Sequence, residues 1–184
     1  MKKYFLILLL FFLLCFTLTL SAQEILSIYF LDVGQGDSAI IVSPSEEVIL
    51  IDSGPDEKII LNYLQNLGIS HIDLLIATHD HDDHITGMDK IVDKYKSRAF
   101  IDPGIPHTSN AYERLLNSLQ KNKITHLKNS AQKIEIGPML FTILPSPYPA
   151  IEESKLNNNS VAMRLDFQIK QGDGSLFDNT LLVL

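Results

Sequence analysis

The sequence has only one cysteine, Cys15, and this residue lies in an apolar N-terminal stretch. Removal of that stretch during export would leave a chain without any cysteine. Disulfide bonds and a thiol nucleophile are then excluded from the remaining chain. The residue before Cys15 is Leu14, where lipoprotein processing needs a small residue, so lipidation is not expected.

Basic residues are also scarce. The whole chain has 15 lysines and arginines against 22 aspartates and glutamates, a formal net charge of −7. Without Lys2 and Lys3, residues 23–184 hold 13 basic against 22 acidic side chains, a charge of −9. Proteins that coat DNA carry basic surfaces, because phosphate contacts need positive charge. A general nucleic-acid coat is therefore excluded, and a nucleic-acid substrate would be held locally, by a metal and a few lysines.

The motifs of several other site classes are missing. The sequence contains no His-Glu-x-x-His, so a zinc protease of that type is excluded. No Gly-Lys-Ser follows the glycines of residues 34–37, which excludes a P-loop. A calcium-binding EF-hand that began at Asp80 would place Ile85 where glycine is required. No internal repeat or low-complexity tract interrupts the chain.

The N-terminus has the composition of a signal peptide over residues 1–22. Lys2 and Lys3 precede an apolar stretch, residues 4–20, and Ser21-Ala22 offers a small-residue cleavage site. We therefore expect a secreted or periplasmic protein whose single domain covers residues 23–184. The apolar stretch is at the short limit for spanning a bilayer, so the alternative is a membrane anchor formed by residues 4–20.

The densest group of ionisable side chains is the run Thr-His-Asp-His-Asp-Asp-His at residues 78–84, directly after an apolar segment. In extended backbone His79, His81 and Asp83 would point the same way, and a turn at His84 would add a fourth donor. Imidazole and carboxylate are the donors that a zinc-type ion takes. A solvated loop is the alternative, but it requires no fixed spacing, so the pattern favours a metal site.

The remaining chain alternates between apolar segments of strand and helix type. Helical spacing of apolar residues predicts helices beginning near residues 56, 88 and 110. Short β-rich segments come before, between and after these helices, which indicates an α/β sandwich. The expected strands cover residues 25–33, 38–43, 48–52, 72–78, 98–102, 133–136, 139–144, 160–169 and 179–184.

The spacing His79-x-His81-x-Asp83-His84 after an apolar strand resembles the signature of the metallo-β-lactamase superfamily of metal-dependent hydrolases. Three further stretches, residues 30–38, 49–54 and 157–161, resemble one branch of it. This branch is typified by the hydrolase domain of bacterial DNA-uptake (competence) channels and their secreted, free-standing relatives. The resemblance implies a four-layer αβ/βα sandwich with the metals at one edge of two packed sheets.

The resemblance also implies the chemistry of the site. Two divalent ions, zinc in preference to manganese, would be bound, the first by His79 and His81 and the second by Asp83 and His84. Asp83 would in addition orient the attacking water. The competence branch implies a phosphodiester substrate, either a small molecule or a nucleic acid, in place of a β-lactam.

Other residues take supporting roles in this comparison. The resemblance places the glycine loop with Asp37, and also Asp52, beside the metals, where Asp52 would orient a ligand by hydrogen bonding. His107 is either an ordinary loop histidine or a residue that faces the substrate. We treat the asparagines at residues 157–159 as structural, and we assign no role to His71 or His126.

The sequence departs from the family pattern at its end. The family continues after a strand like residues 179–184 with a Gly-Asp that bridges the metals and a later histidine-rich loop. We therefore expect a C-terminally truncated chain in which the second half of the fold is incomplete. Two hypotheses follow: an exported hydrolase whose sequence is incomplete, and an inactive remnant that binds metal weakly.

Overall fold

The computed structural model of the chain describes residues 25–170 and 176–183. The signal peptide expected at residues 1–22 lies outside this part of the chain, and so does Leu184. No helix in the described residues is long and apolar enough to cross a membrane. Export and the alternative membrane anchor therefore stay predictions.

A six-stranded sheet carries the N-terminal half of the chain, in the order β1-β2-β3-β4-β5-β6. Strands β1 to β3 are antiparallel, whereas β3 to β6 run parallel. In the parallel part Ile51 pairs with Ile76, Ile76 with Ile101, and Ile101 with Leu127. The carboxyl ends of these four strands therefore meet at one edge. The strands are β1 (Ser27–Phe30), β2 (Ala39–Val42), β3 (Val48–Ile51), β4 (Leu74–Ile76), β5 (Ala99–Ile101) and β6 (Thr125–Leu127).

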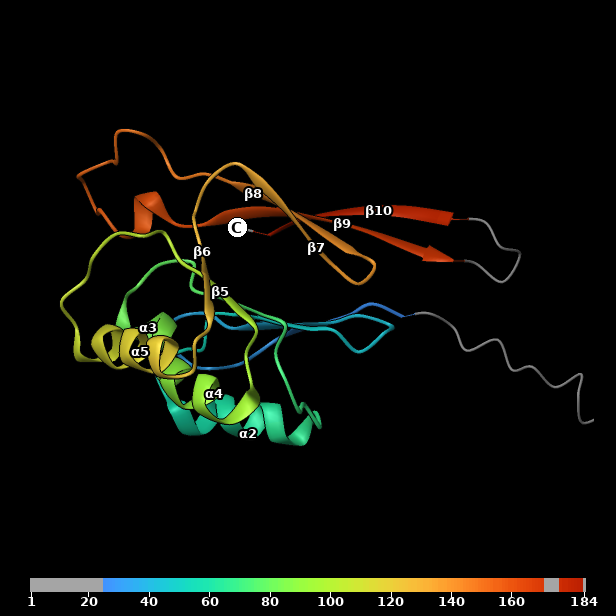
Figure 1. Cartoon of the computed structure of the whole chain (residues 1–184), viewed down its shortest axis with the longest axis horizontal. Helices are drawn as coiled ribbons and strands as arrows, with labels where there is room; N and C mark the ends of the chain where they lie inside the picture. The colour runs from blue at the N-terminus through green and yellow to red at the C-terminus, as the bar shows by residue number, and fades with distance from the viewer. Residues whose placement is uncertain (1–24, 171–175, 184) are drawn as a thin grey trace, which may run out of the picture.

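Helices cover one face of this sheet (Figure 1). The three longer ones are α2 (Glu57–Asn66), α4 (Met88–Tyr95) and α5 (Asn110–Lys121). Two begin at side-chain caps, where Asp56 accepts from Lys58 N and Ser109 from Tyr112 N. Their apolar stripes pack on the sheet in one hydrophobic cluster, as the helical spacing predicted.

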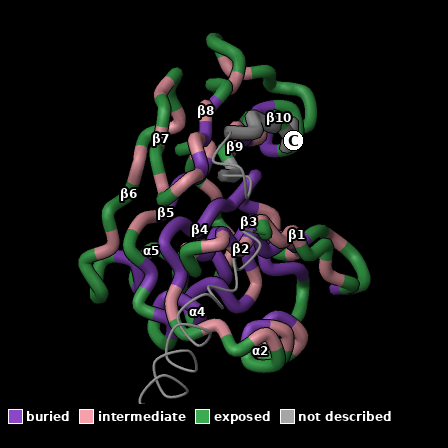
Figure 2. Tube along the Cα trace, turned by 90° about the vertical axis from the view of Figure 1, so that its right-hand side faces the viewer, coloured by how far each residue is buried: buried purple, intermediate pink, exposed green. Residues whose placement is uncertain are grey.

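A four-stranded antiparallel sheet, in the order β10-β9-β8-β7, packs on the opposite face (Figure 1). Leu74 and Ile76 of β4 join the core between the two sheets, whereas Leu75 points into the core under the helices. The central strands are thus buried on both faces, as Figure 2 shows for β2 to β4. The second sheet consists of β7 (Gln132–Ile136), β8 (Met139–Leu144), β9 (Ala162–Lys170) and β10 (Leu176–Val183).

The α/β sandwich expected from the sequence is confirmed. The described residues supply three layers, which are helices, first sheet and second sheet. The strand expected at residues 179–184 is part of β10, which forms the outer strand of the second sheet and pairs with β9. The expected incompleteness of the second half of the fold stays a prediction.

Two sequence predictions about the first sheet are wrong. Strand β6 was not expected, because it is only three residues long and two of its side chains are exposed. The segment after β4 was expected to be extended up to a turn at His84. Instead it forms the short helix α3 (Asp82–Ile85), with His81 as the residue that precedes its first turn.

Candidate metal centre

The metal loop, residues 78–84, begins where the chain leaves β4 at the carboxyl edge of the parallel strands. Three of the four predicted ligands have their rings together here. The centroid of the His79 ring lies 3.9 Å from that of His84 and 4.9 Å from that of His81. Helix α3, and not an extended backbone, brings Asp83 and His84 back towards the first two histidines.

Asp52 follows β3 at the same edge and anchors the metal loop. Its carboxylate accepts hydrogen bonds from Thr78 N (2.7 Å), Thr78 Oγ1 (2.6 Å) and His84 Nδ1 (2.8 Å). The sequence placed Asp52 in the strand, but its φ of 53° turns the chain out of β3. Asp52 is 1% exposed, so this arrangement is shielded from water. The predicted orienting role of Asp52 thus has a direct geometric basis.

The contact with Asp52 determines the pKa and the tautomer of His84. Burial alone would lower the pKa of this imidazole, but the hydrogen bond and the charge of Asp52 outweigh burial and raise it. In the neutral ring the proton lies on Nδ1, because that nitrogen faces the carboxylate. Nε2 then keeps its lone pair, which is the form of histidine that binds a metal.

The glycine loop between β1 and β2 packs on the metal loop from the other side. Gln35 Nε2 donates to Asp83 Oδ2 at 3.2 Å. A Cβ on Gly36 would lie 1.9 Å from the carbonyl oxygen of Asp83, and the φ of Gly36 is 79°. Only glycine is compatible with this φ angle and with so short a distance between the two backbones. The exposed Asp37 is near enough for its charge to act on the pKa of both His79 and His84.

His107 lies beside the cluster, on the connection between β5 and α5. Its ring centroid is 5.9 Å from that of His81 and 6.4 Å from that of Tyr112. Of the two sequence interpretations, this position fits the one in which His107 faces the site.

The donor chemistry of the metal loop fits a zinc-type ion. Burial, followed by the charges of His84 and His81, lowers the pKa of His79 to about 4, so this ring is neutral at pH 7 and can donate a lone pair. Across residues 25–170 and 176–183, however, no three His, Cys, Asp or Glu side chains are arranged to hold one ion.

Asp80 has an unusual environment behind the histidines. It is fully buried, and neither of its carboxylate oxygens has a hydrogen-bond partner within the described part of the chain. Burial, with the added charges of Asp102 and Asp52, raises the pKa of Asp80 to about 8. The side chain is therefore protonated at neutral pH and lies near carboxylates from the ends of both β3 and β5.

We expect Asp80→Asn to stabilise the metal-free protein increasingly as the pH rises. The pKa of Asp80 is higher in the folded chain than the unfolded value of about 3.9, so wild-type stability falls between about pH 4 and pH 8. Asparagine does not titrate, so the variant avoids this loss. Its free energy of unfolding should exceed that of the wild type by the order of 3 kcal/mol at pH 7. Urea unfolding in chelator at pH 5 and at pH 7.5 measures this gain. A gain that is equal at both pH values would contradict the assignment.

The sequence reasoning missed five residues at this edge. For Thr78, Asp80 and Asp102 the available signal is one rule, that side chains which follow neighbouring parallel strands meet at the carboxyl edge of the sheet. That rule needs the strand order, and β6 was not recognised. The missed residues are Gln35, Thr78, Asp80, Asp102 and His126.

Fold and site together define an α/β protein of two stacked sheets with a histidine and carboxylate cluster at one edge. The chain belongs to the metallo-beta-lactamase superfamily, because residues 31–150 match the family model of that superfamily. Members of this superfamily usually bind two divalent metal ions, commonly zinc. The comparison with curated proteins gave no match.

Solved structures show the same fold at low sequence identity. The chain is similar to MEM-A1, a subclass B3 metallo-beta-lactamase isolated from a soil metagenome library, with a TM-score of 0.52, 17% identity and 84% of this chain covered. The chain is also similar to a metallo-beta-lactamase mutant from Cronobacter sakazakii, with a TM-score of 0.52, 15% identity and 85% of this chain covered. The chain spans 59% of the first structure and 63% of the second.

Proposed function

We propose that this chain belongs to an exported, metal-dependent hydrolase that cleaves phosphodiesters at the metal loop. The observation that carries the proposal is the convergence of nitrogen and oxygen donors at one edge: three imidazoles lie beside one another, with His84 held by Asp52 and Asp83 held by Gln35. Such a set of nitrogen and oxygen donors suits zinc better than calcium or magnesium.

The substrate class is supported by where the competence-type segments lie. Each of the three stretches that carry this resemblance touches the metal loop. Gln35 donates to Asp83, Ser53 N donates to the carbonyl oxygen of His84 at 2.7 Å, and Val161 N donates to that of Thr78 at 2.8 Å. The residues that resemble the competence branch thus surround the proposed site, which favours a phosphodiester over a β-lactam.

The residues have separable tasks in this proposal. Bound divalent ions would lower the pKa of a water molecule from about 15.7 towards roughly 7. His79, His81 and His84 would hold the ions through neutral nitrogens, and Asp52 would fix the ring of His84. Asp83, which Gln35 keeps in place, would orient the attacking water and accept its proton.

We expect Asp83→Asn to lower the turnover of a simple phosphodiester by about 10²- to 10⁴-fold, because the amide cannot accept a proton. The circular dichroism spectrum and the melting temperature should stay unchanged, since Asp83 is only half-buried. Asp82→Asn is the matched control, because Asp82 is the exposed preceding residue of the same helix and its side chain makes no hydrogen bond to any described residue. Equal losses in both variants would exclude a specific role for Asp83.

A second candidate function is weak metal binding without turnover. It is favoured by one observation, that the described residues hold no group of three donors arranged around a common point. Metal titration followed by calorimetry separates the two candidates. Zinc binding weaker than micromolar, without hydrolysis of any phosphodiester, would favour the second.

Export is a separate part of the proposal, supported by the composition of residues 1–22. Mass spectrometry of the protein recovered from the culture medium or periplasm tests it. An N-terminus at Gln23 would agree with cleavage after Ala22. Recovery of the full-length chain from the membrane fraction would favour the anchor formed by residues 4–20.

A further inference from the structure

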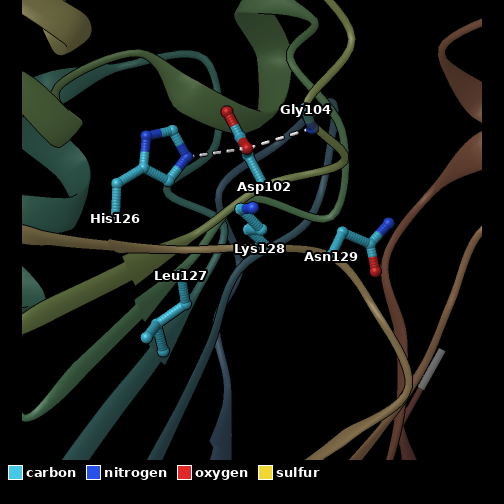
Figure 3. A pocket seen from close by; sticks show the side chains of 6 residues that line it. All are labelled: Asp102, Gly104, His126, Leu127, Lys128 and Asn129. Carbon is cyan, nitrogen blue, oxygen red and sulfur yellow. Dashed lines mark hydrogen bonds and ion pairs between the residues drawn. The ribbon is translucent and has the colours of Figure 1, made fainter.

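A pocket of about 360 Å³ opens at the carboxyl ends of β5 and β6, beside the metal loop. Because β4, β5 and β6 are neighbouring parallel strands about 4.8 Å apart, the ends of β4 and β6 are separated by roughly 10 Å. A group bound in this pocket is thus a neighbour of a group at the metal loop. Figure 3 shows the six lining residues, Asp102, Gly104, His126, Leu127, Lys128 and Asn129.

Asp102 lies beneath this pocket and is 1% exposed. Its Oδ1 accepts hydrogen bonds from His126 Nε2 at 2.9 Å and from Gly104 N at 3.0 Å. The hydrogen bond from Asp102 raises the pKa of His126, so the ring is held towards its charged form. The buried negative charge of Asp102 is thereby offset by the more exposed imidazole at the rim.

Lys128 then supplies an uncompensated positive charge. Its side chain is exposed, and within the described residues no carboxylate lies within ion-pair distance of its ammonium group. Asn129 follows it and is held in place by a hydrogen bond from Nδ2 to Ser146 Oγ at 2.6 Å. Lys128 thus places a positive charge at the rim of this pocket, in a chain whose formal net charge is −7.

We propose that this pocket binds a phosphate group of the substrate, next to the phosphodiester that is cleaved at the metal loop. The inference rests on the proposed function and narrows its substrate class to chains with more than one phosphate, such as an oligonucleotide. Lys128 and His126 would contact the anion, and Asp102 would position His126. Phosphates repeat along a nucleic acid, so a strand cleaved at the metal loop presents a neighbouring phosphate to this pocket.

The direct test is a titration of the chelator-treated full chain with inorganic phosphate, followed by the Cε1–H resonances of its six histidines in NMR spectra. His126→Gln identifies the resonance of His126. We expect this resonance to shift and saturate, whereas that of the distant His71 stays constant. No saturable shift at His126, or shifts confined to His79, His81 and His84, would overturn the proposal.

Two lysine variants test whether the binding is local. Lys128→Ala should weaken phosphate binding by about tenfold, the loss of one charge-assisted contact. Lys58→Ala removes the same charge from the exposed surface of α2 and should leave the affinity unchanged. If both variants bind phosphate equally weakly, the affinity depends on the overall charge of the protein and not on this pocket, which would overturn the proposal. Acetate should bind far more weakly than phosphate, and equal binding would show a site for any oxyanion.

The titration uses metal-free protein, so its outcome does not depend on hydrolysis. With added metal, Lys128→Ala should raise KM for an oligonucleotide by about tenfold and leave KM for a substrate with one phosphate unchanged. A protein that binds phosphate at His126 but hydrolyses nothing would refute the proposed function alone. Hydrolysis of an oligonucleotide with an unchanged KM in Lys128→Ala would refute the pocket alone.

Discussion

Replacing His79 and His81 together by alanine should remove stoichiometric zinc or manganese from the purified protein. A tight zinc site needs three protein donors, and the double variant keeps only Asp83 and His84 of the four predicted here. We expect the metal content, measured by plasma emission spectroscopy, to fall from one or two ions per chain to about a tenth of an ion or less.

The control for this experiment is His71→Ala, because His71 lies before β4, at the opposite end of the strand, and contacts Asp73. This variant should keep its full metal content. The circular dichroism spectrum of the double variant should match that of the wild type, since the two replaced rings belong to neither hydrophobic core. An unchanged metal content in the double variant would place the site elsewhere.

Replacing Asp52 by alanine should cost about 3–5 kcal/mol of unfolding free energy. The carboxylate accepts from Thr78 N, Thr78 Oγ1 and His84 Nδ1, and all three donors would be left buried without this partner. Asp52→Asn keeps the shape of the side chain, so it should lower the free energy of unfolding by less than Asp52→Ala. Urea unfolding in the presence of chelator measures these losses without a contribution from bound metal.

Glu153→Ala is the matched control, because this carboxylate is exposed and its loss should change stability by less than about 0.5 kcal/mol. A further readout separates orientation from stability. Asp52→Asn should weaken zinc binding by about 10- to 100-fold, since His84 loses the partner that sets its tautomer. If Asp52→Ala lowers the free energy of unfolding by less than about 1 kcal/mol, water replaces the carboxylate and the metal loop has no rigid anchor.

The elements that local patterns define could be predicted from the sequence. Ile60 and Leu64 of α2, and Leu115 and Leu119 of α5, recur at helical spacing, and all four are buried. Asp56 and Ser109 cap these two helices, close to residues 56 and 110, where the apolar spacing predicted the helices to begin. The continuous apolar segment before the metal loop predicted the strand β4, and the structure buries this strand on both faces. These signals act over a few residues, so one sequence contains them.

The metal loop was predicted in part. The spacing of His79, His81 and His84 indicated the site, and their rings lie together. The backbone was expected to be extended, but Asp82 and Asp83 begin a helical turn, in which acidic residues at the N-terminus are favourable. An alternating pattern of histidine and aspartate does not distinguish a strand from a turn, because all of these side chains are polar.

The pairings across the sheet edge could not be predicted. Asp102 and His126 are 24 residues apart and meet only because β5 and β6 are adjacent. Strand β6 is short and partly exposed, so it lacks the apolar signal that marks β4. The buried, unpartnered Asp80 is equally invisible in the sequence, where it is one more acidic residue in a polar run.

The central claim is that the metal loop supports metal-dependent cleavage of phosphodiesters. The most direct measurement compares the hydrolysis of bis(p-nitrophenyl) phosphate with that of a chromogenic cephalosporin by the purified protein with added zinc or manganese. We predict turnover of the phosphodiester that chelator abolishes and metal restores, with the cephalosporin at background. Hydrolysis of the cephalosporin without the phosphodiester, or phosphodiester turnover that chelator does not affect, would contradict the account.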